Sequence, residues 1–158
     1  MGPDALLPDA AMASALQSEA PGLSALAAAQ RLTACGIRVT EQRLQLASLL
    51  LSVSQHLSAE QITEALRRAG TRVSKATVYN TLNLFAARGL IRQVNVDGSC
   101  AWFDSNVAPH YHFHDEQTGA LLDVEPRDVQ FSRLPQPPSG MEVAGIDVVI
   151  RLRRRSAD

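Results

Sequence analysis

Residues 73–104, VSKATVYNTLNLFAARGLIRQVNVDGSCAWFD, decide the fold of this chain. Ser74 is a good helix N-cap residue, and Val78, Leu82 and Phe85 follow it at the 3.6-residue period of a helix with one buried face. Further on, β-prone residues flank an Asp-Gly pair, which favours a tight hairpin turn. The stretch therefore predicts a helix followed by a β-hairpin.

The residues before this stretch predict three shorter helices. The first spans about 23–34, Thr40 caps the second, and Ser58 caps the third with Gln61 at capping-box spacing. The expected inward positions are Leu44, Ala47, Leu50 and Leu51 in the second helix and Ile62, Ala65 and Leu66 in the third. Three helices and a hairpin form a winged helix-turn-helix, in which the helix after Ser74 enters the DNA major groove.

That helix carries side chains that suit DNA. Asn80 offers an amide that can pair twice with adenine, while Thr77 or Tyr79 can contact a thymine methyl group. The positive side chains nearby are better suited to phosphates. The residues expected to bind DNA are Arg38, Arg43, Lys75, Thr77, Tyr79 and Asn80. The competing interpretation is an ordinary polar helix face.

The charge of the chain is divided, although its net value is only -1. From 30 to 92 there are nine Arg or Lys residues and three acids, a balance of +6, whereas 93–150 hold two basic residues and nine acids, a balance of -7. A basic N-terminal half is typical of a nucleic-acid-binding unit. The acidic half suits a cation better than an anion.

After Asp104 the pattern changes to short strands. Residues 110–114, 120–124 and 145–154 are expected strands, and a loop or short helix with a Pro-rich end separates the second from the third. So small a sheet has little core of its own, so we expect it to pair with a second copy. The predicted fold is α+β: an N-terminal winged helix-turn-helix followed by a small α/β dimerisation domain.

Three of the four histidines alternate along the first of these strands, at 110, 112 and 114. Residues i and i+2 of a strand point to one face, about 6–7 Å apart, so their imidazoles can converge on a metal ion or a haem iron. With the DNA-binding pattern, this indicates a sensor. Two alternatives remain: a His-X-His metalloenzyme, or a ligand-free repressor whose histidines only fix the hinge.

These segments together resemble the ferric uptake regulator (Fur) family. The resemblance rests on GIRVTEQRLQLASLL, HLSAEQITEAL, VSKATVYNTLNLF and GSCAWFD followed by a His-X-His strand, and it covers about 28–155. Within the family, VSKATVYNTLNLF, QVNVDGSCAWFDSNVAPHYHFH and PPSGMEVAGIDVVIRLRRR most resemble the iron response regulator (Irr) of alphaproteobacteria.

The resemblance implies a regulatory metal, Fe²⁺, Mn²⁺ or Zn²⁺, held between the two domains. Its implied ligands are His56, Asp104, His110, His112 and Asp123. A ligand that joins His56 to the His-X-His strand would fix the angle between two winged helices and so set the affinity for DNA.

The Irr branch implies a second effector, haem. The implied haem ligands are His110, His112 and His114. Such a protein binds promoter DNA as a homodimer, chiefly to repress haem-synthesis and iron-homeostasis genes under low iron. Haem, which the resemblance implies could be passed on by a haem-delivering enzyme, then releases the protein from DNA. The alternative within the family is a repressor that binds DNA with its metal.

The chain also departs from the family pattern. It has two cysteines, Cys35 and Cys100, and no CxxC pair, so no structural four-cysteine zinc site is expected. Asp115 and Thr118 stand where the first pair would be. A further family metal site is expected to be lost, since Pro109 and Tyr111 replace its ligands, and no Cys-Pro haem motif exists. The helix position that is often Arg in Fur is Asn80, so a different operator is expected.

Three domains are expected. Residues 1–21 form a flexible N-terminal arm, 22–104 the winged-helix DNA-binding domain, and 105–158 the dimerisation and metal- or haem-sensing domain. The N-terminus lacks the basic start of a secretory signal, and no run approaches the ~18 apolar residues of a membrane span. We therefore expect a cytoplasmic protein. From the DNA-binding pattern and the resemblance, we also expect that it is not an enzyme.

Overall fold

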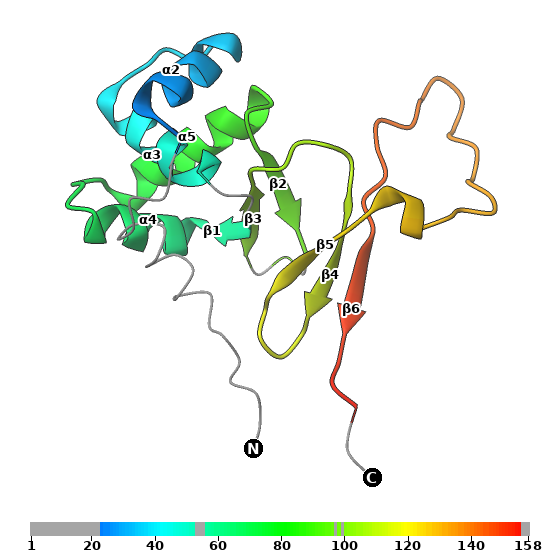
Figure 1. Ribbon diagram of the computed structural model, residues 1–158. Helices are drawn as coiled ribbons and strands as arrows, with labels where there is room; N and C mark the ends of the chain where they lie inside the picture. Colours follow the sequence, from blue (N-terminus) through cyan, green and yellow to red (C-terminus); the bar gives the residue numbers. More distant parts are fainter. Residues whose placement is uncertain (1–22, 53–55, 97, 99, 156–158) are drawn as a thin grey trace. The chain divides into compact units, whose positions relative to one another are not determined.

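The computed structural model of the protein describes residues 23–52, 56–96, 98 and 100–155 (Figure 1). These fall into two compact units, one within Met1–Val107 and the other within Ala108–Asp158. The predicted arm, residues 1–21, lies outside the described residues. The roles assigned to the predicted domains stay predictions.

Four helices in the described part of the first unit confirm the predicted ones. They are α2 (Ala25–Ala34), α3 (Glu41–Leu51), α4 (Ala59–Arg68) and α5 (Lys75–Ala87). The capping box of α4 is complete: the Gln61 backbone N–H donates to Ser58 Oγ at 3.2 Å, and the Ser58 N–H donates to Gln61 Oε1 at 2.9 Å. Ser74 caps α5 as predicted, and its side chain accepts the N–H of Thr77. Local capping chemistry thus sets where these helices begin.

The helices enclose one apolar core. Val78, Leu82 and Phe85 of α5 are fully buried, as their spacing predicts, and so is Ile62 of α4. The stripe predicted for α3 is partly wrong. The structure buries Leu46, Ala47 and Leu50 and leaves Leu44 and Leu51 half-buried, because leucines lie on several faces of this helix. Burial of α5 in this core fixes which of its faces stays exposed.

A three-stranded sheet completes the first unit. Its strands are β1 (His56–Ser58), β2 (Arg92–Asn95) and β3 (Ala101–Asp104), in the antiparallel order β1-β3-β2. The β2–β3 pair is the predicted hairpin. Gly98 has φ +77°, and Asp97 lies outside the described residues. Strand β1 was not predicted, because three residues directly before a helix cap are too few to show an alternating pattern.

The second unit is also a three-stranded sheet. Strands β4 (Tyr111–Asp115), β5 (Leu121–Val124) and β6 (Val149–Leu152) lie in the order β5-β4-β6, with β5 antiparallel and β6 parallel to β4. A single turn of 3₁₀ helix, η1 (Pro126–Asp128), follows β5, and a long irregular loop leads to β6 (Figure 1).

Strands β5 and β6 are shorter than predicted, and β6 begins only at Val149. Strand β4 has the predicted length but starts one residue later, so His110 lies just before it. The α+β fold class is confirmed: a helical N-terminal region is followed by a small sheet-containing domain. Among the described residues, no helix is long and apolar enough to cross a membrane.

Candidate metal centre and nucleic-acid interface

In the first unit, the sheet brings together two of the predicted metal ligands. His56 on β1 lies opposite Asp104 on β3, and its Nε2 is 3.1 Å from Asp104 Oδ2. The Asp104 side chain is fully buried, and its Oδ1 accepts the backbone N–H of Asn106 at 2.8 Å. A buried carboxylate needs such partners. These contacts fix its orientation, and the unpredicted strand β1 is what places His56 beside it.

In the second unit, three more predicted ligands lie together. His112 on β4 is opposite Asp123 on β5, and the ring centroids of His110 and His112 are 4.6 Å apart. Asp123 Oδ1 lies 3.5 Å from His110 Nε2 and 4.0 Å from His112 Nε2. One ligand atom from each of these residues lies within 4.8 Å of the other two. Both imidazoles are buried, whereas the Asp123 side chain is 38% exposed.

The hydrogen bonding of His110 determines which of its nitrogens can bind a metal. Its Nδ1 is 2.7 Å from the carbonyl oxygen of Ala108, and a carbonyl only accepts, so Nδ1 carries the proton and donates. The lone pair of a neutral ring is then on Nε2, which faces the Asp123 carboxylate. A nitrogen lone pair beside a carboxylate oxygen suits a metal cation. Metal-binding histidines in proteins are commonly oriented by this kind of bond to the second nitrogen.

His114 lies on the same strand but outside this group. The ligand atoms that lie together in this unit come from His110, His112 and Asp123. His114 is buried as well, and its Nδ1 has no hydrogen-bond partner among the described residues. The three alternating histidines are therefore not equivalent, which their spacing does not reveal.

The turn after β4 shows how the chain is held where the family pattern has cysteines. Asp115 Oδ1 accepts the backbone N–H groups of Gln117 at 2.8 Å and Thr118 at 3.3 Å. The hydrogen bond from Gln117 is the main reason that the pKa of Asp115 lies below its ordinary value. Thr118 Oγ1 in turn accepts the N–H of Ala120. A hydrogen-bonded turn thus stands at this position, and Cys35 and Cys100 form no disulfide bond.

Four of the predicted DNA-binding residues lie on α5, whereas Arg43 lies on α3 and Arg38 lies just before α3. All are in the first unit. Asn80 is exposed, whereas the Thr77 hydroxyl shares a 2.8 Å hydrogen bond with the Ser74 cap. Arg43 Nη1 donates to the backbone oxygen of Arg38 at 2.9 Å, which links these two predicted phosphate contacts. Thr77 is thus partly committed to the helix N-terminus, while Asn80 projects from the exposed face.

The remaining two predicted contacts meet on an acid that the sequence analysis missed. Lys75 Nζ is 3.0 Å from Glu60 Oε1, and the Tyr79 hydroxyl donates to the same oxygen at 3.1 Å. Lys75 Nζ also lies 5.9 Å from the centre of the Tyr79 ring. The hydrogen bond from Lys75 is the largest cause that lowers the pKa of Glu60, so the carboxylate is ionised at neutral pH. Glu60 is on α4, and no local pattern connects it with residues on α5.

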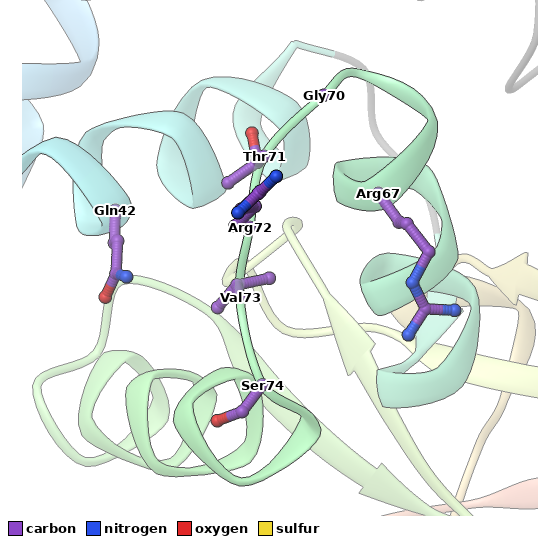
Figure 2. A pocket seen from close by; sticks show the side chains of 7 residues that line it. All are labelled: Gln42, Arg67, Gly70, Thr71, Arg72, Val73 and Ser74. Atoms are coloured by element: carbon purple, nitrogen blue, oxygen red, sulfur yellow. The ribbon is translucent and has the colours of Figure 1, made fainter.

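A pocket of about 660 Å³ lies at the connection between α4 and α5 (Figure 2). Its lining residues are Gln42, Arg67, Gly70, Thr71, Arg72, Val73 and Ser74. Arg67 is paired with Glu64 at 3.2 Å, while Arg72 is exposed on the connection itself. Positive side chains beside the N-terminus of a helix suit a phosphate group. Arg72 was not among the predicted DNA-binding residues, although its place two residues before the Ser74 cap is a usable signal.

Comparisons with known proteins agree with this architecture. The model of the "Ferric uptake regulator family" matches residues 34–149. The peroxide-responsive repressor PerR of Staphylococcus aureus (strain Mu50) is 34% identical over 109 residues, which cover 68% of this chain and 74% of PerR.

Solved structures agree as well. The ferric uptake regulator of Pseudomonas aeruginosa with manganese superposes with a TM-score of 0.62 at 28% identity, over 80% of this chain and 97% of that one. The Vibrio cholerae ferric uptake regulator has a TM-score of 0.61 at 22% identity, over 80% and 98%, and so supports the fold alone. From these matches in sequence and structure, the chain belongs to the ferric uptake regulator family of transcription regulators.

Proposed function

We propose that this protein is a metal-responsive repressor that binds promoter DNA as a homodimer through α5. The observation that carries the proposal is the grouping of three side chains: the buried imidazoles of His110, just before β4, and His112, on β4, with the carboxylate of Asp123 on β5. The family membership supports a regulator whose effector is a metal ion, and the relatives from Staphylococcus aureus are named as repressors.

His110, His112 and Asp123 provide two nitrogen donors and one oxygen donor for this ion. Fe²⁺, Mn²⁺ and Zn²⁺ accept such mixed sets and take four to six ligands, so three protein ligands leave coordination positions to fill. No sulfur takes part, which favours these ions over the softer Cu⁺. The Pseudomonas relative is described with manganese, so Mn²⁺ is the first ion to test.

We further propose that His56 and Asp104 complete the coordination. The pair has the same chemistry, one imidazole and one carboxylate, and it is already held together in the first unit. Only five residues, 105–109, separate Asp104 from His110, so the chain can extend no more than about 20 Å between the two ligands. An ion with ligands from both units adds positive charge and restricts their relative movement.

Regulation then follows from a difference in affinity. A ligand shifts a conformational equilibrium only as far as it binds one conformer better than the other. If the ion favours the arrangement in which both α5 helices of a dimer meet successive major grooves, then its binding raises the affinity for DNA. Asn80 and Tyr79 read bases in this scheme, while Arg38, Arg43 and Lys75 contact phosphates.

The Irr-like alternative, with haem as the signal for release from DNA, makes a different demand on the histidines. The side chains of His110, His112 and His114 are at most 7% exposed. Ligation of a haem through one of them would require the sheet to open around a large planar ring. A small ion needs no such opening, so we propose that the metal is the effector. A haem-delivering partner belongs to the alternative only.

Metal titration by calorimetry on the full chain tests this proposal. His112→Ala removes one ligand and is expected to abolish micromolar Mn²⁺ binding. His114→Ala is the matched control, because it removes an equally buried imidazole from the same strand, and it should bind Mn²⁺ as the wild type does. An absorbance titration with haem runs in parallel. A stoichiometric Soret shift that His114→Ala removes, without binding of Mn²⁺, Fe²⁺ or Zn²⁺, would contradict the proposal.

A further inference from the structure

One carboxylate oxygen engages two of the side chains expected to bind DNA. Glu60 Oε1 lies 3.0 Å from Lys75 Nζ and 3.1 Å from the Tyr79 hydroxyl. The Glu60 and Lys75 side chains are 51% and 61% exposed, so this cluster lies at the surface. It joins the first turn of α4 to the first two turns of α5.

Glu60 differs from the other acids of the basic half of the chain. Between 30 and 92 there are only three acids. Glu41 accepts a hydrogen bond from Gln45 on its own helix, and Glu64 pairs with Arg67 and Arg68 on its own helix. Within the described residues, Glu60 is the acid of this set that bonds to the predicted DNA-reading helix.

A negative charge at this place opposes DNA binding. Lys75 holds the pKa of Glu60 below its ordinary value, so the carboxylate stays charged at neutral pH. It repels phosphates, and it also occupies a lysine that would otherwise neutralise one. If Glu60 did nothing else, a neutral residue at this position would give tighter DNA binding. Its second contact, with Tyr79, offers a function that can offset this loss of affinity.

That contact fixes the direction of an aromatic side chain. The Tyr79 ring is half-buried against the apolar core, and the hydrogen bond to Glu60 Oε1 holds its hydroxyl end in one direction. The ring is then placed before DNA arrives, so less conformational entropy is lost on binding. The pKa of the Tyr79 hydroxyl is raised, by burial first and then by this bond, so it remains a donor.

We propose that Glu60 is a positioning residue that sets sequence discrimination: it aims Tyr79 at a base edge and competes with DNA phosphates for Lys75. On DNA, Lys75 exchanges the carboxylate for a phosphate, while Tyr79 keeps its bond to Glu60. Glu60 thus lowers the affinity for every duplex and raises the preference for the correct one. The inference rests on the proposed DNA-binding function of α5.

The test compares two duplexes. One is selected from a random pool by the wild-type protein with Mn²⁺, and the other is a scrambled duplex of the same length and composition. Glu60→Gln keeps an oxygen that accepts from Tyr79 but removes the charge, whereas Glu60→Ala removes both. Glu64→Gln is the matched control, because it removes the same charge from the same helix without touching α5.

Three results are expected from fluorescence anisotropy. Both Glu60 variants bind the scrambled duplex about two- to five-fold more tightly, which matches the contribution of one exposed ion pair. In Glu60→Ala the ratio of selected to scrambled affinity falls about five-fold or more, which is near the smallest effect of losing one base contact. Glu60→Gln keeps that preference, and Glu64→Gln changes it by less than two-fold.

A double-mutant cycle with Tyr79→Phe separates positioning from general helix stability. If Glu60 acts through the Tyr79 hydroxyl, adding Glu60→Ala to Tyr79→Phe causes no further loss of preference. An unchanged preference in Glu60→Ala would overturn the inference, as would equal losses in Glu60→Gln and Glu60→Ala. If the wild-type protein itself selected no duplex, the proposed function would fail instead, so the two failures are distinguishable.

Discussion

The two units of this protein bury different kinds of side chain. The first encloses a cluster of seventeen buried hydrophobic residues within its described part, from Ala28 of α2 to Phe103 of β3. In the described part of the second, the buried hydrophobic residues are Leu121 and Val124, and three histidines are buried with them. The first unit thus has a large apolar core, whereas polar imidazoles make up much of the buried interior of the second.

The surface of the second unit shows the same difference. Its exposed large hydrophobic residues are Leu122, Phe131, Leu134, Met141, Val143, Ile146, Ile150 and Leu152. A soluble chain rarely leaves so many apolar groups in one small unit uncovered. The difference supports our proposal that the second unit depends on partners, a metal ion inside and a second copy outside, and that it is the sensing part.

The largest expected effect is on the core of the first unit. Phe85→Ala should lower its free energy of unfolding by about 3–5 kcal/mol, since Phe85 is fully buried and leaves a large cavity. Urea unfolding followed by the fluorescence of Trp102, the single tryptophan, reports on this unit. Phe131→Ala, in the second unit and 45% exposed, is the control and should leave this transition unchanged. If both variants lowered the free energy of unfolding of the Trp102 transition equally, the apolar core would not be confined to the first unit.

The next effect concerns the metal-dependent stability of the second unit. At an Mn²⁺ concentration 100 times its dissociation constant, binding should stabilise this unit by about 2.7 kcal/mol. Scanning calorimetry with increasing Mn²⁺ should show that the midpoint temperature of this unit's transition rises in the wild type. In His112→Ala the midpoint temperature should not change. If the transition of the second unit did not move in the wild type, or moved equally in His112→Ala, the ion would not be held by this histidine–aspartate group.

A smaller effect is expected on dimerisation. Leu122→Glu places a charge on an exposed apolar position of β5 and should weaken the dimer at least ten-fold, or about 1.4 kcal/mol. Leu26→Glu is the matched control from the first unit, where Leu26 is 69% exposed on α2. Sedimentation velocity over a concentration series distinguishes them. Equal dimer dissociation by both variants would mean that the apolar surface of the second unit has no special role.

The smallest effect is expected at the pocket beside α5. Arg72→Ala should weaken binding to all duplexes about equally, and the slope of log K against log salt should fall in magnitude by about 0.9, as for one lost phosphate contact. Arg133→Ala removes an arginine from the second unit and is the control. A preference for some duplexes over others in the Arg72 variant would show that Arg72 reads bases instead.

Sequence reasoning succeeded where local chemistry decides the structure. Ser58 and Ser74 cap helices because their side chains bond to N–H groups three residues on, and such signals are visible in any sequence. It failed where distant segments meet. Strand β1 exists only because it pairs with β3, and the contact between Glu60 and Tyr79 depends on how α4 and α5 pack.

The metal ligands show the same limit. Alternation along a strand identifies His110, His112 and His114 as candidates, but only the pairing of β4 with β5 separates them. Register brings Asp123 opposite His112, whereas His114 lies opposite Leu121. Family resemblance supplied His56 and Asp104, and the structure gives the physical reason why those two lie together.

The most direct measurement is the affinity of the full chain for its selected duplex, followed by fluorescence anisotropy with and without Mn²⁺. If the histidine–aspartate group controls DNA binding, Mn²⁺ should raise the affinity by about 5–150-fold, the usual range of coupling between two sites. His112→Ala should bind with the low metal-free affinity under both conditions. An affinity that did not respond to metal in the wild type, or one that responded equally in His112→Ala, would contradict the proposed mechanism.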